Sequence, residues 1–151
     1  MVSVIISSAN PTHLKQVTEN ITTTIGVPFE IIAIDNSKGQ QGICAVYNQG
    51  IRQARYDMLC FMHEDIVIKT DNWGKYVIQF FNEHADYGLL GVGGSEYKTI
   101  APSGWNCTGK EAAYINIIQG FKYDKKEPFH YYRNPGNKAL AEVACVDGVW
   151  F

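Results

Sequence analysis

The chain has 151 residues, of which 46% are hydrophobic and 19% are charged, and 13 Lys and Arg against 15 Asp and Glu give a formal net charge of -2 at pH 7. These values are typical of a globular protein and exclude a disordered chain, a collagen-like fibre and an acidic or basic tail protein. A near-neutral charge argues against a nucleic-acid partner, because binding along a phosphate backbone needs many clustered Lys and Arg side chains.

Apolar, β-branched runs alternate with helical patterns through the first hundred residues. Runs that indicate strands lie at residues 2–7, 29–34, 58–62 and 89–92. Stretches with apolar side chains every three or four positions indicate helices at residues 12–24, 43–55 and 73–84. This alternation predicts an α/β fold with a mostly parallel central sheet flanked by helices. The first and third runs are nearly continuous in apolar residues, which is typical of parallel strands buried on both faces.

The pattern changes after Gly94. Residues 95–110 form a loop rich in Gly, Pro and Ser, and residues 112–118 are expected to form a strand. An irregular aromatic segment follows at residues 121–138, and a last strand is expected at residues 139–146. No shift in composition marks a linker, so we expect one domain over residues 1–151. The apolar residues 149–151 suggest a fold that is cut short at its C-terminus, and they would be adhesive if nothing covered them.

The four cysteines, at positions 44, 60, 107 and 145, are far apart in the sequence and form no C-x-x-C pair. We therefore predict reduced thiols in a cytoplasmic protein instead of a zinc site or a disulfide framework. No secretory signal is visible, and no apolar run approaches the roughly 20 residues of a transmembrane segment. A peripheral position at the inner face of a membrane, or the head of a longer protein, are the alternatives.

Polar side chains follow the first three expected strands at the point where each strand ends. Those positions are Ser8 and Asn10, then Asp35, Asn36 and Ser37, then His63, Glu64 and Asp65. Ligands of parallel α/β sheets bind outside the carboxyl ends of the strands, and this set suits a ligand with a heterocycle, hydroxyl groups and a metal-bound diphosphate. Neither G-x-G-x-x-G after the first strand nor G-x-x-x-x-G-K-[ST] is present, which disfavours a dinucleotide site or a P-loop.

Each of these residues also has a purely structural interpretation. Asp35 could make a turn, Asn10 could cap the following helix, and the last triplet could be a solvated loop. Alternatively, an acidic residue of this triplet could hold Mg²⁺ or Mn²⁺ together with water and substrate phosphates. Because side chains alternate along a strand, His63 and Asp65 would face one side and Glu64 the other.

In their order and spacing these motifs resemble family 2 glycosyltransferases with the GT-A fold. The resemblance runs over nearly the whole chain and is carried by residues 2–8 with Asn10, 30–37, 47–51, 59–66, Trp73, 91–95 and 146–148. The triplet His63, Glu64 and Asp65 fits a bacterial branch whose acidic motif reads His-x-Asp instead of Asp-x-Asp.

The resemblance implies a Rossmann-like GT-A nucleotide-diphospho-sugar transferase domain, with a nucleotide-binding half at residues 1–94 and an incomplete acceptor-side half at residues 95–151. The activity would be that of a hexosyltransferase-like enzyme. It would transfer a sugar, with inversion, from a nucleotide-sugar donor to a hydroxyl of a saccharide or lipid-linked acceptor, and a UDP-sugar is the favoured donor. Such a reaction belongs to the synthesis of polysaccharides or glycolipids.

The resemblance also implies roles for individual residues. The donor would contact Ser8, Asn10, Asp35, Asn36, Asn48, His63 and Glu64. Asp35 would accept a hydrogen bond from the nucleobase, and Asp65 would ligate a divalent cation, Mg²⁺ or Mn²⁺, that stabilises the leaving diphosphate. The carboxylate base of the family normally lies beyond the equivalent of residues 146–148, so the catalytic residue is unknown. Asp147 is a candidate for it, and a position near the acceptor pocket or in a plain turn is the favoured interpretation.

Three functions stay open at this point. The chain could be an enzyme or the donor-binding portion of one, a catalytically silent nucleotide-sugar binding module or fragment that lacks the base, or an unrelated α/β domain for protein interaction. Nucleotide binding would separate the third function from the other two, and sugar transfer would separate the first from the second.

Overall fold

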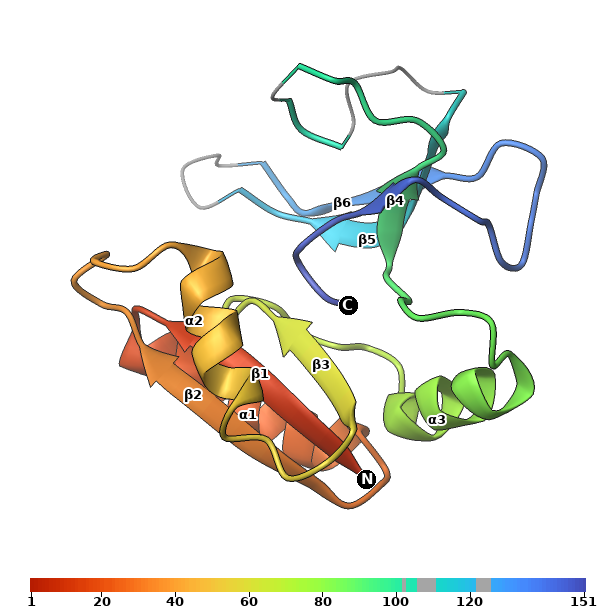
Figure 1. The fold of residues 1–151 in the computed structure, drawn as a ribbon. Helices are drawn as coiled ribbons and strands as arrows, with labels where there is room; N and C mark the ends of the chain where they lie inside the picture. The colour runs from red at the N-terminus through yellow and green to blue at the C-terminus, as the bar shows by residue number, and fades with distance from the viewer. Residues whose placement is uncertain (102, 106–110, 122–125) are drawn as a thin grey trace. The chain divides into compact units, whose positions relative to one another are not determined.

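The computed structural model describes residues 1–101, 103–105, 111–121 and 126–151. Its helices and strands are labelled in Figure 1. The chain divides into two compact units, one formed by residues 1–89 with 148–150 and the other by residues 90–147 with Phe151. Both helices and strands are present, so the predicted α/β class is confirmed. None of the helices in the described ranges is long and apolar enough to cross a membrane.

The first unit is built on a parallel three-stranded sheet with the order β2-β1-β3. Its strands are β1 (Val2–Ser8), β2 (Phe29–Asp35) and β3 (Met58–Met62). The register pairs Ser8 with Asp35 and Ile6 with Met62, so the three carboxyl ends lie at one edge of the sheet. Residues 2–6 of the central strand are all buried, as the continuous apolar run predicts for a strand covered on both faces.

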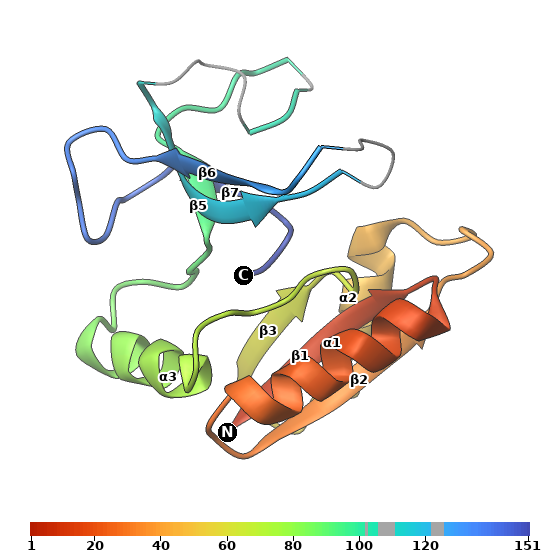
Figure 2. The ribbon, with the colours of Figure 1, turned by 180° about the vertical axis from the view of Figure 1, so that it is seen from behind.

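Two helices, α1 (Pro11–Thr24) and α2 (Ile43–Ile51), cover opposite faces of this sheet, as the two views in Figures 1 and 2 show. Alternate residues of β1 serve the two faces. Val4 and Ile6 belong to the buried cluster that also contains Val17 and Ile21 of α1. On the other face, a Cβ added to Gly50 of α2 would lie 2.3 Å from Cγ2 of Ile5. Only glycine at position 50 therefore lets α2 approach the sheet this closely.

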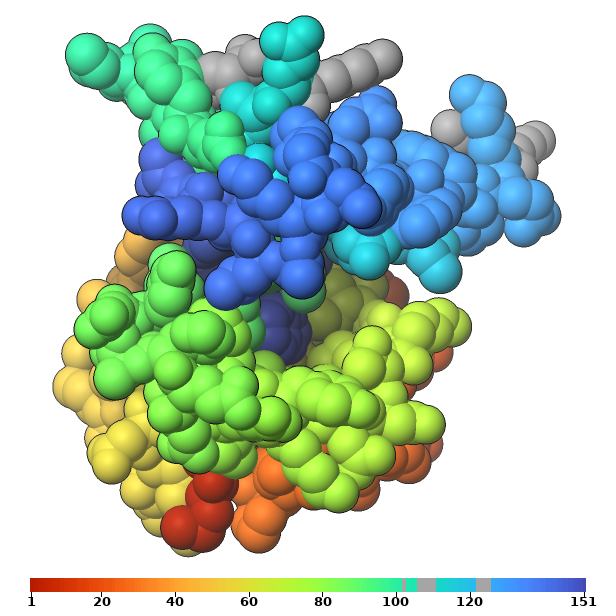
Figure 3. Space-filling model, turned by 90° about the vertical axis from the view of Figure 1, so that its right-hand side faces the viewer, coloured from red at the N-terminus to blue at the C-terminus, as the bar shows by residue number. Residues whose placement is uncertain are grey.

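The third helix, α3 (Trp73–Glu83), is attached to the end of α1 through its first turn. The indole N–H of Trp73 donates to Oγ1 of Thr24 at 3.1 Å, and the backbone N–H of Gly74 donates to the carbonyl of Ile25 at 3.0 Å. Beyond this first turn the helix has an open outer surface, drawn in yellow-green to green in Figure 3, on which Tyr76 is 60% exposed.

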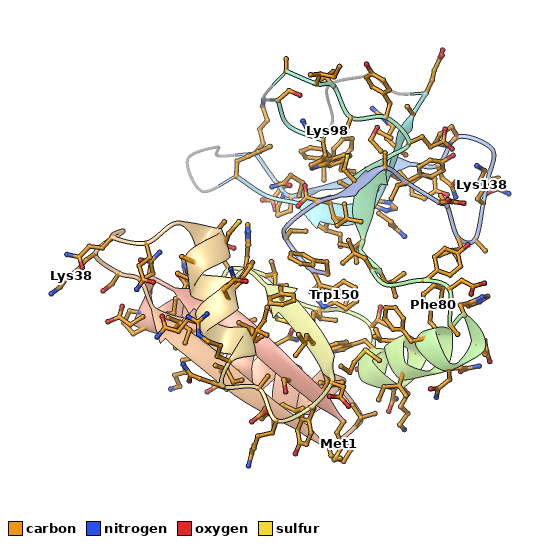
Figure 4. All side chains as sticks on the ribbon, in the orientation of Figure 1. Met1, Lys38, Phe80, Lys98, Lys138 and Trp150 are labelled. Carbon is orange, nitrogen blue, oxygen red and sulfur yellow. The ribbon has the colours of Figure 1, made fainter. Side chains whose placement is uncertain are left out.

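Trp150, near the end of the chain, packs in the first unit. Its ring makes an edge contact with Trp73 at a centroid distance of 5.8 Å, and its backbone forms a β-bridge with Met62. Next to it, the carbonyl of Val149 accepts a hydrogen bond from the backbone N–H of His63 at 3.0 Å. The side chain of Trp150 is labelled in Figure 4. Trp150 is thus half-buried against its own unit.

The second unit contains an antiparallel sheet with the order β6-β5-β4-β7. Its strands are β4 (Gly93–Ser95), β5 (Ala113–Gln119), β6 (Phe129–Arg133) and β7 (Cys145–Val146). The predicted fourth parallel strand at residues 89–92 is wrong, because the strand begins at Gly93 and pairs antiparallel with β5 and β7. A Cβ on Gly94 would lie 2.5 Å from the carbonyl oxygen of Cys145, so this close pairing requires glycine, which a sequence pattern treats as a break.

Two further expectations for the second half of the chain are wrong. The segment 121–138, expected to be irregular, contains β6, which pairs with β5 from Gln119↔Phe129 to Ile115↔Arg133. The segment 139–146, expected to be a strand, forms a strand only at Cys145–Val146. Most side chains of β6 are exposed, so its sequence lacks the alternation of apolar and polar residues by which a half-buried strand is recognised.

The described cysteines are free thiols. Cys60 is buried in β3, where burial raises the pKa of its thiol, whereas Cys44 is exposed on α2. Cys145 lies in β7 and is half-buried. Cys107 lies outside the described residues.

Candidate functional site

The polar residues that follow β1, β2 and β3 lie in a row at the carboxyl-terminal end of the parallel sheet. Ser8 ends β1 opposite Asp35, which ends β2. On the other side of β1, the hydroxyl of Ser8 donates to Oε2 of Glu64 at 2.8 Å. Adjacent strands are about 4.8 Å apart, so Asp35 and the residues after β3 lie about 10 Å from each other across β1. The sequence therefore predicts correctly that these residues share one edge of one sheet.

The carboxylate of Glu64 is directed toward the start of α1. Besides the Ser8 hydroxyl, it accepts hydrogen bonds from the backbone N–H groups of Ala9 at 3.1 Å and Asn10 at 3.0 Å. A negative charge is favourable at this place, because unpaired N–H groups and the helix dipole make the N-terminus of a helix positive. Glu64 therefore ties the end of β3 to the junction between β1 and α1.

Asn10 and Asn36 make hydrogen bonds that organise the backbone. Oδ1 of Asn10 accepts from the backbone N–H groups of Thr12 at 2.9 Å and His13 at 3.4 Å, which makes Asn10 the N-cap of α1. The amide of Asn36 donates to the carbonyl of Gln41 at 2.9 Å and accepts from the N–H of the same residue at 3.2 Å. Asn36 thus closes the loop that follows β2, and the predicted contacts of both residues with a donor stay predictions.

Asp35, the last residue of β2, directly precedes this loop and is exposed. Its Oδ1 accepts a hydrogen bond from the backbone N–H of Ser37 at 2.8 Å. The hydrogen bonds from Ser37, with a smaller contribution from the positive charge of Lys38, hold the pKa of the Asp35 carboxyl below its usual value. Asp35 is therefore an ionised hydrogen-bond acceptor at neutral pH. Figure 4 labels Lys38, which projects from the outer end of the loop.

His63 and Asp65 form an exposed pair just after the end of β3. Nδ1 of His63 lies 3.9 Å from Oδ1 of Asp65, and the two side chains are 50% and 64% exposed. Glu64, between them in sequence, faces Ser8. The pair presents an imidazole and a carboxylate to a ligand at this edge of the sheet.

Asn20 of α1, which sequence reasoning missed, holds the backbone that follows the triplet His63, Glu64 and Asp65. Its amide donates to the carbonyl of Ile68 at 3.1 Å and accepts from the N–H of Ile68 at 2.7 Å. The available signal is the residue type, because asparagine is a poor choice for the interior of a helix unless its side chain has a partner. This argument draws attention to Asn48 of α2, whose side chain is exposed.

Asp147, the candidate catalytic residue, belongs to the second unit. Its backbone N–H donates to the carbonyl of Gly93 at 2.7 Å, and its carboxylate accepts a hydrogen bond from the indole N–H of Trp105. The side chain is half-buried. These contacts fix Asp147 within its own sheet, and its catalytic role stays a prediction.

The residues at the sheet edge suit one kind of metal site. Among the described residues, no group of three or more His, Cys, Asp and Glu side chains is placed to hold a metal ion. Mg²⁺ and related ions are often held by only one or two carboxylates, with waters and substrate phosphates as the other ligands. The exposed carboxylate of Asp65 fits such a role.

The sequence model of a glycosyltransferase-like family matches residues 3–151. The chain belongs to this glycosyltransferase-like family. The match includes every residue of the candidate site and confirms the predicted class of enzyme, a glycosyltransferase. Its partners are therefore, in general terms, a sugar donor and an acceptor. No curated protein matches the chain. Membership of family 2, the His-x-Asp motif and the GT-A arrangement stay predictions.

Proposed function

We propose that this glycosyltransferase has the GT-A arrangement and binds a nucleotide-sugar donor at the carboxyl ends of β1, β2 and β3. The observation that carries the proposal is the position of Ser8, Asp35 and Glu64 at the carboxyl ends of three adjacent strands. His63 and Asp65 are exposed beside them. Carboxyl ends of parallel strands are where ligands of such sheets bind. A UDP-sugar as donor, a polysaccharide or glycolipid product and a cytoplasmic location are parts of the same proposal.

In this proposal Asp35 and His63 recognise the nucleoside. Asp35 is ionised and exposed, so it can accept a hydrogen bond from an N–H group of the base, such as that of uracil. His63, which follows β3 on the other side of β1 from Asp35, would contact the ribose and the phosphates. The loop that Asn36 closes would lie against the base. Ser8, at the end of β1, and Asn10, the N-cap of α1, would contact the base and the ribose.

Asp65 is the residue that would hold a divalent cation, Mg²⁺ or Mn²⁺, against the diphosphate. When bound, such an ion acts as a Lewis acid that stabilises the negative charge of the leaving group. The acceptor hydroxyl forms the new C–O bond while the bond from the anomeric carbon to the diphosphate breaks. A carboxylate base removes the hydroxyl proton, and the anomeric centre is inverted.

Isothermal titration calorimetry with UDP and GDP, each with and without Mn²⁺, tests the donor site. We expect one nucleotide to bind more tightly with Mn²⁺, Asp35→Ala to abolish binding, and Asp65→Ala to remove the effect of Mn²⁺. Asp57→Ala is the matched control, because Asp57 is an exposed carboxylate just before β3, at the opposite edge of the sheet. If neither nucleotide binds the wild-type chain, the proposal is wrong.

Sugar transfer separates an enzyme from a silent binding module. The assay follows the release of UDP from UDP-sugars in the presence of saccharide or lipid-linked acceptors. We expect acceptor-dependent release that requires Asp65. A chain that binds UDP but forms no UDP from UDP-sugars with any of these acceptors would be a binding module instead.

A further inference from the structure

The segment that carries Asp65 is held at both ends by side chains that bond to backbone groups. At its start, the carboxylate of Glu64 accepts from the N–H groups of Ala9 and Asn10. Near its end, the side-chain amide of Asn20 pairs with both backbone groups of Ile68. We call these contacts the Glu64 anchor and the Asn20 anchor. The Glu64 anchor lies at the residues just before α1 and the Asn20 anchor lies within α1, so the two points are ten residues, or about 15 Å, apart along the helix axis.

We propose that Glu64 and Asn20 are positioning residues that fix Asp65 for metal-dependent binding of a nucleoside diphosphate. The inference rests on the proposed donor site and adds to it the residues that act on the metal ligand. A carboxylate that binds an ion must be held close to its productive position, and residues around a metal ligand can change metal affinity 10- to 100-fold. The side chain of Asp65 is 64% exposed, so the anchors on either side of it supply this restraint through the backbone.

The geometry favours positioning over direct ligation by Glu64. Oε1 of Glu64 accepts from Ala9 at 3.1 Å and Asn10 at 3.0 Å, and Oε2 accepts from the Ser8 hydroxyl at 2.8 Å and Asn10 at 3.2 Å. Turning this carboxylate toward a cation would remove these bonds and leave the donors at the start of α1 without their acceptor. Asp65 has no such commitment to backbone donors among the described hydrogen bonds, so it is free to turn toward an ion.

The same sheet contains a matched control for the Glu64 anchor. At the opposite edge, Glu30 of β2 accepts from the hydroxyl of Ser3 of β1 at 2.7 Å and from the backbone N–H of Arg55 at 2.7 Å. Glu30 and Glu64 thus each accept bonds from a serine of β1 and from backbone N–H groups. Glu30→Gln weakens hydrogen bonds of the same two kinds, and in addition the ion pair of Glu30 with the Arg55 guanidinium, at the end of the sheet that carries no predicted donor contact.

The experiment measures UDP affinity with and without Mn²⁺ by calorimetry, and the thermal midpoint, for the wild-type chain and the variants Glu64→Gln, Asn20→Ala and Glu30→Gln. We expect the Mn²⁺-dependent gain in affinity to fall about tenfold in Glu64→Gln and in Asn20→Ala. We expect UDP affinity without Mn²⁺ to change less than about twofold in Asn20→Ala, and to fall by less in Glu64→Gln than the Mn²⁺-dependent gain falls. Glu30→Gln lowers the thermal midpoint to a similar extent and leaves the gain intact. If Glu64→Gln fails to fold, Asn20→Ala carries the test.

The possible outcomes separate this inference from the donor site itself. If the Mn²⁺-dependent gain in UDP affinity is the same in the wild-type chain and in both anchor variants, the inference is wrong and the donor site is unaffected. An equal loss of UDP affinity with and without Mn²⁺ in Glu64→Gln also overturns it, because Glu64 would then touch the nucleotide directly. A wild-type chain whose affinity for UDP and GDP does not respond to Mn²⁺ overturns the metal-assisted proposal, and the inference with it.

Discussion

At the residue scale, the first unit uses the same residue type at both edges of its sheet. Glu30 accepts a hydrogen bond from Ser3, which is directly opposite in the register, and further bonds from the N–H and the guanidinium of Arg55. The hydroxyl of Ser3 and then the backbone of Arg55 hold the pKa of the Glu30 carboxyl below its ordinary value of 4.5. Such a group stabilises the folded state in its ionised form.

We predict that Glu30→Gln reduces the loss of stability in acid. A lowered pKa gives a contribution that is complete above the unfolded value of 4.5 and is lost as the pH falls through the lower folded value. Urea unfolding between about pH 6 and about pH 3 measures the free energy of unfolding of both proteins. The variant should be less stable at about pH 6, and its stability should fall less steeply. Parallel curves would show that Glu30 titrates alike in the folded and unfolded chains.

At the element scale, glycine explains both a close contact and a wrong prediction. Gly50 brings α2 onto Ile5 of β1, and Gly94 brings β4 against Cys145. The helices and strands of the first unit follow from apolar periodicity, because each buries an apolar face against its neighbours. β4 does not follow from it, since its short Gly-Gly-Ser sequence has no apolar side chains. β6 does not either, because its pairing with β5 holds side chains that are mostly exposed.

We predict that Gly50→Ala destabilises the first unit by about 1 to 2 kcal/mol. The new methyl group would lie 2.3 Å from Cγ2 of Ile5, a β-branched side chain that is fully buried. Overpacking of this kind costs about 1–3 kcal/mol, which exceeds the gain in helix propensity of at most about 1 kcal/mol. Urea unfolding followed by circular dichroism measures the change. Gly88→Ala is the control, because a Cβ there meets nothing within 4 Å; equal stability of the two variants would contradict the proposed contact.

At the scale of the whole molecule, the chain leaves the first unit after residue 89 and contributes to it again at residues 148–150. The return is held by the contacts of Trp150 with Met62 and Trp73, and by the bond from His63 to Val149. The N–H of His63 is thereby fixed by a residue 86 positions later in the sequence. The candidate site therefore depends on the last residues of the chain for part of its support.

We predict that Trp150→Ala lowers the free energy of unfolding of the first unit by about 2 kcal/mol. Truncation of a fully buried tryptophan costs about 3–5 kcal/mol, and Trp150 is only half-buried. Urea unfolding followed by far-ultraviolet circular dichroism is the measurement, since the change removes a fluorophore. Tyr76→Ala on the exposed side of α3 should change stability by less than about 0.5 kcal/mol. An unchanged midpoint in Trp150→Ala would show that the return contributes nothing.

The sequence by itself determined the α/β class, the three parallel strands and the residue types at their carboxyl ends, because these depend on local periodicity and on where each strand stops. Only the tertiary structure decided how those side chains are used. Glu64 bonds to Asn10 across 54 positions and Asn20 to Ile68 across 48. Such pairs depend on strand register and helix docking, which no local pattern contains. Register and docking also decide that Glu30 and Glu64 accept hydrogen bonds from distant parts of the chain, whereas Asp35 and Asp65 stay exposed.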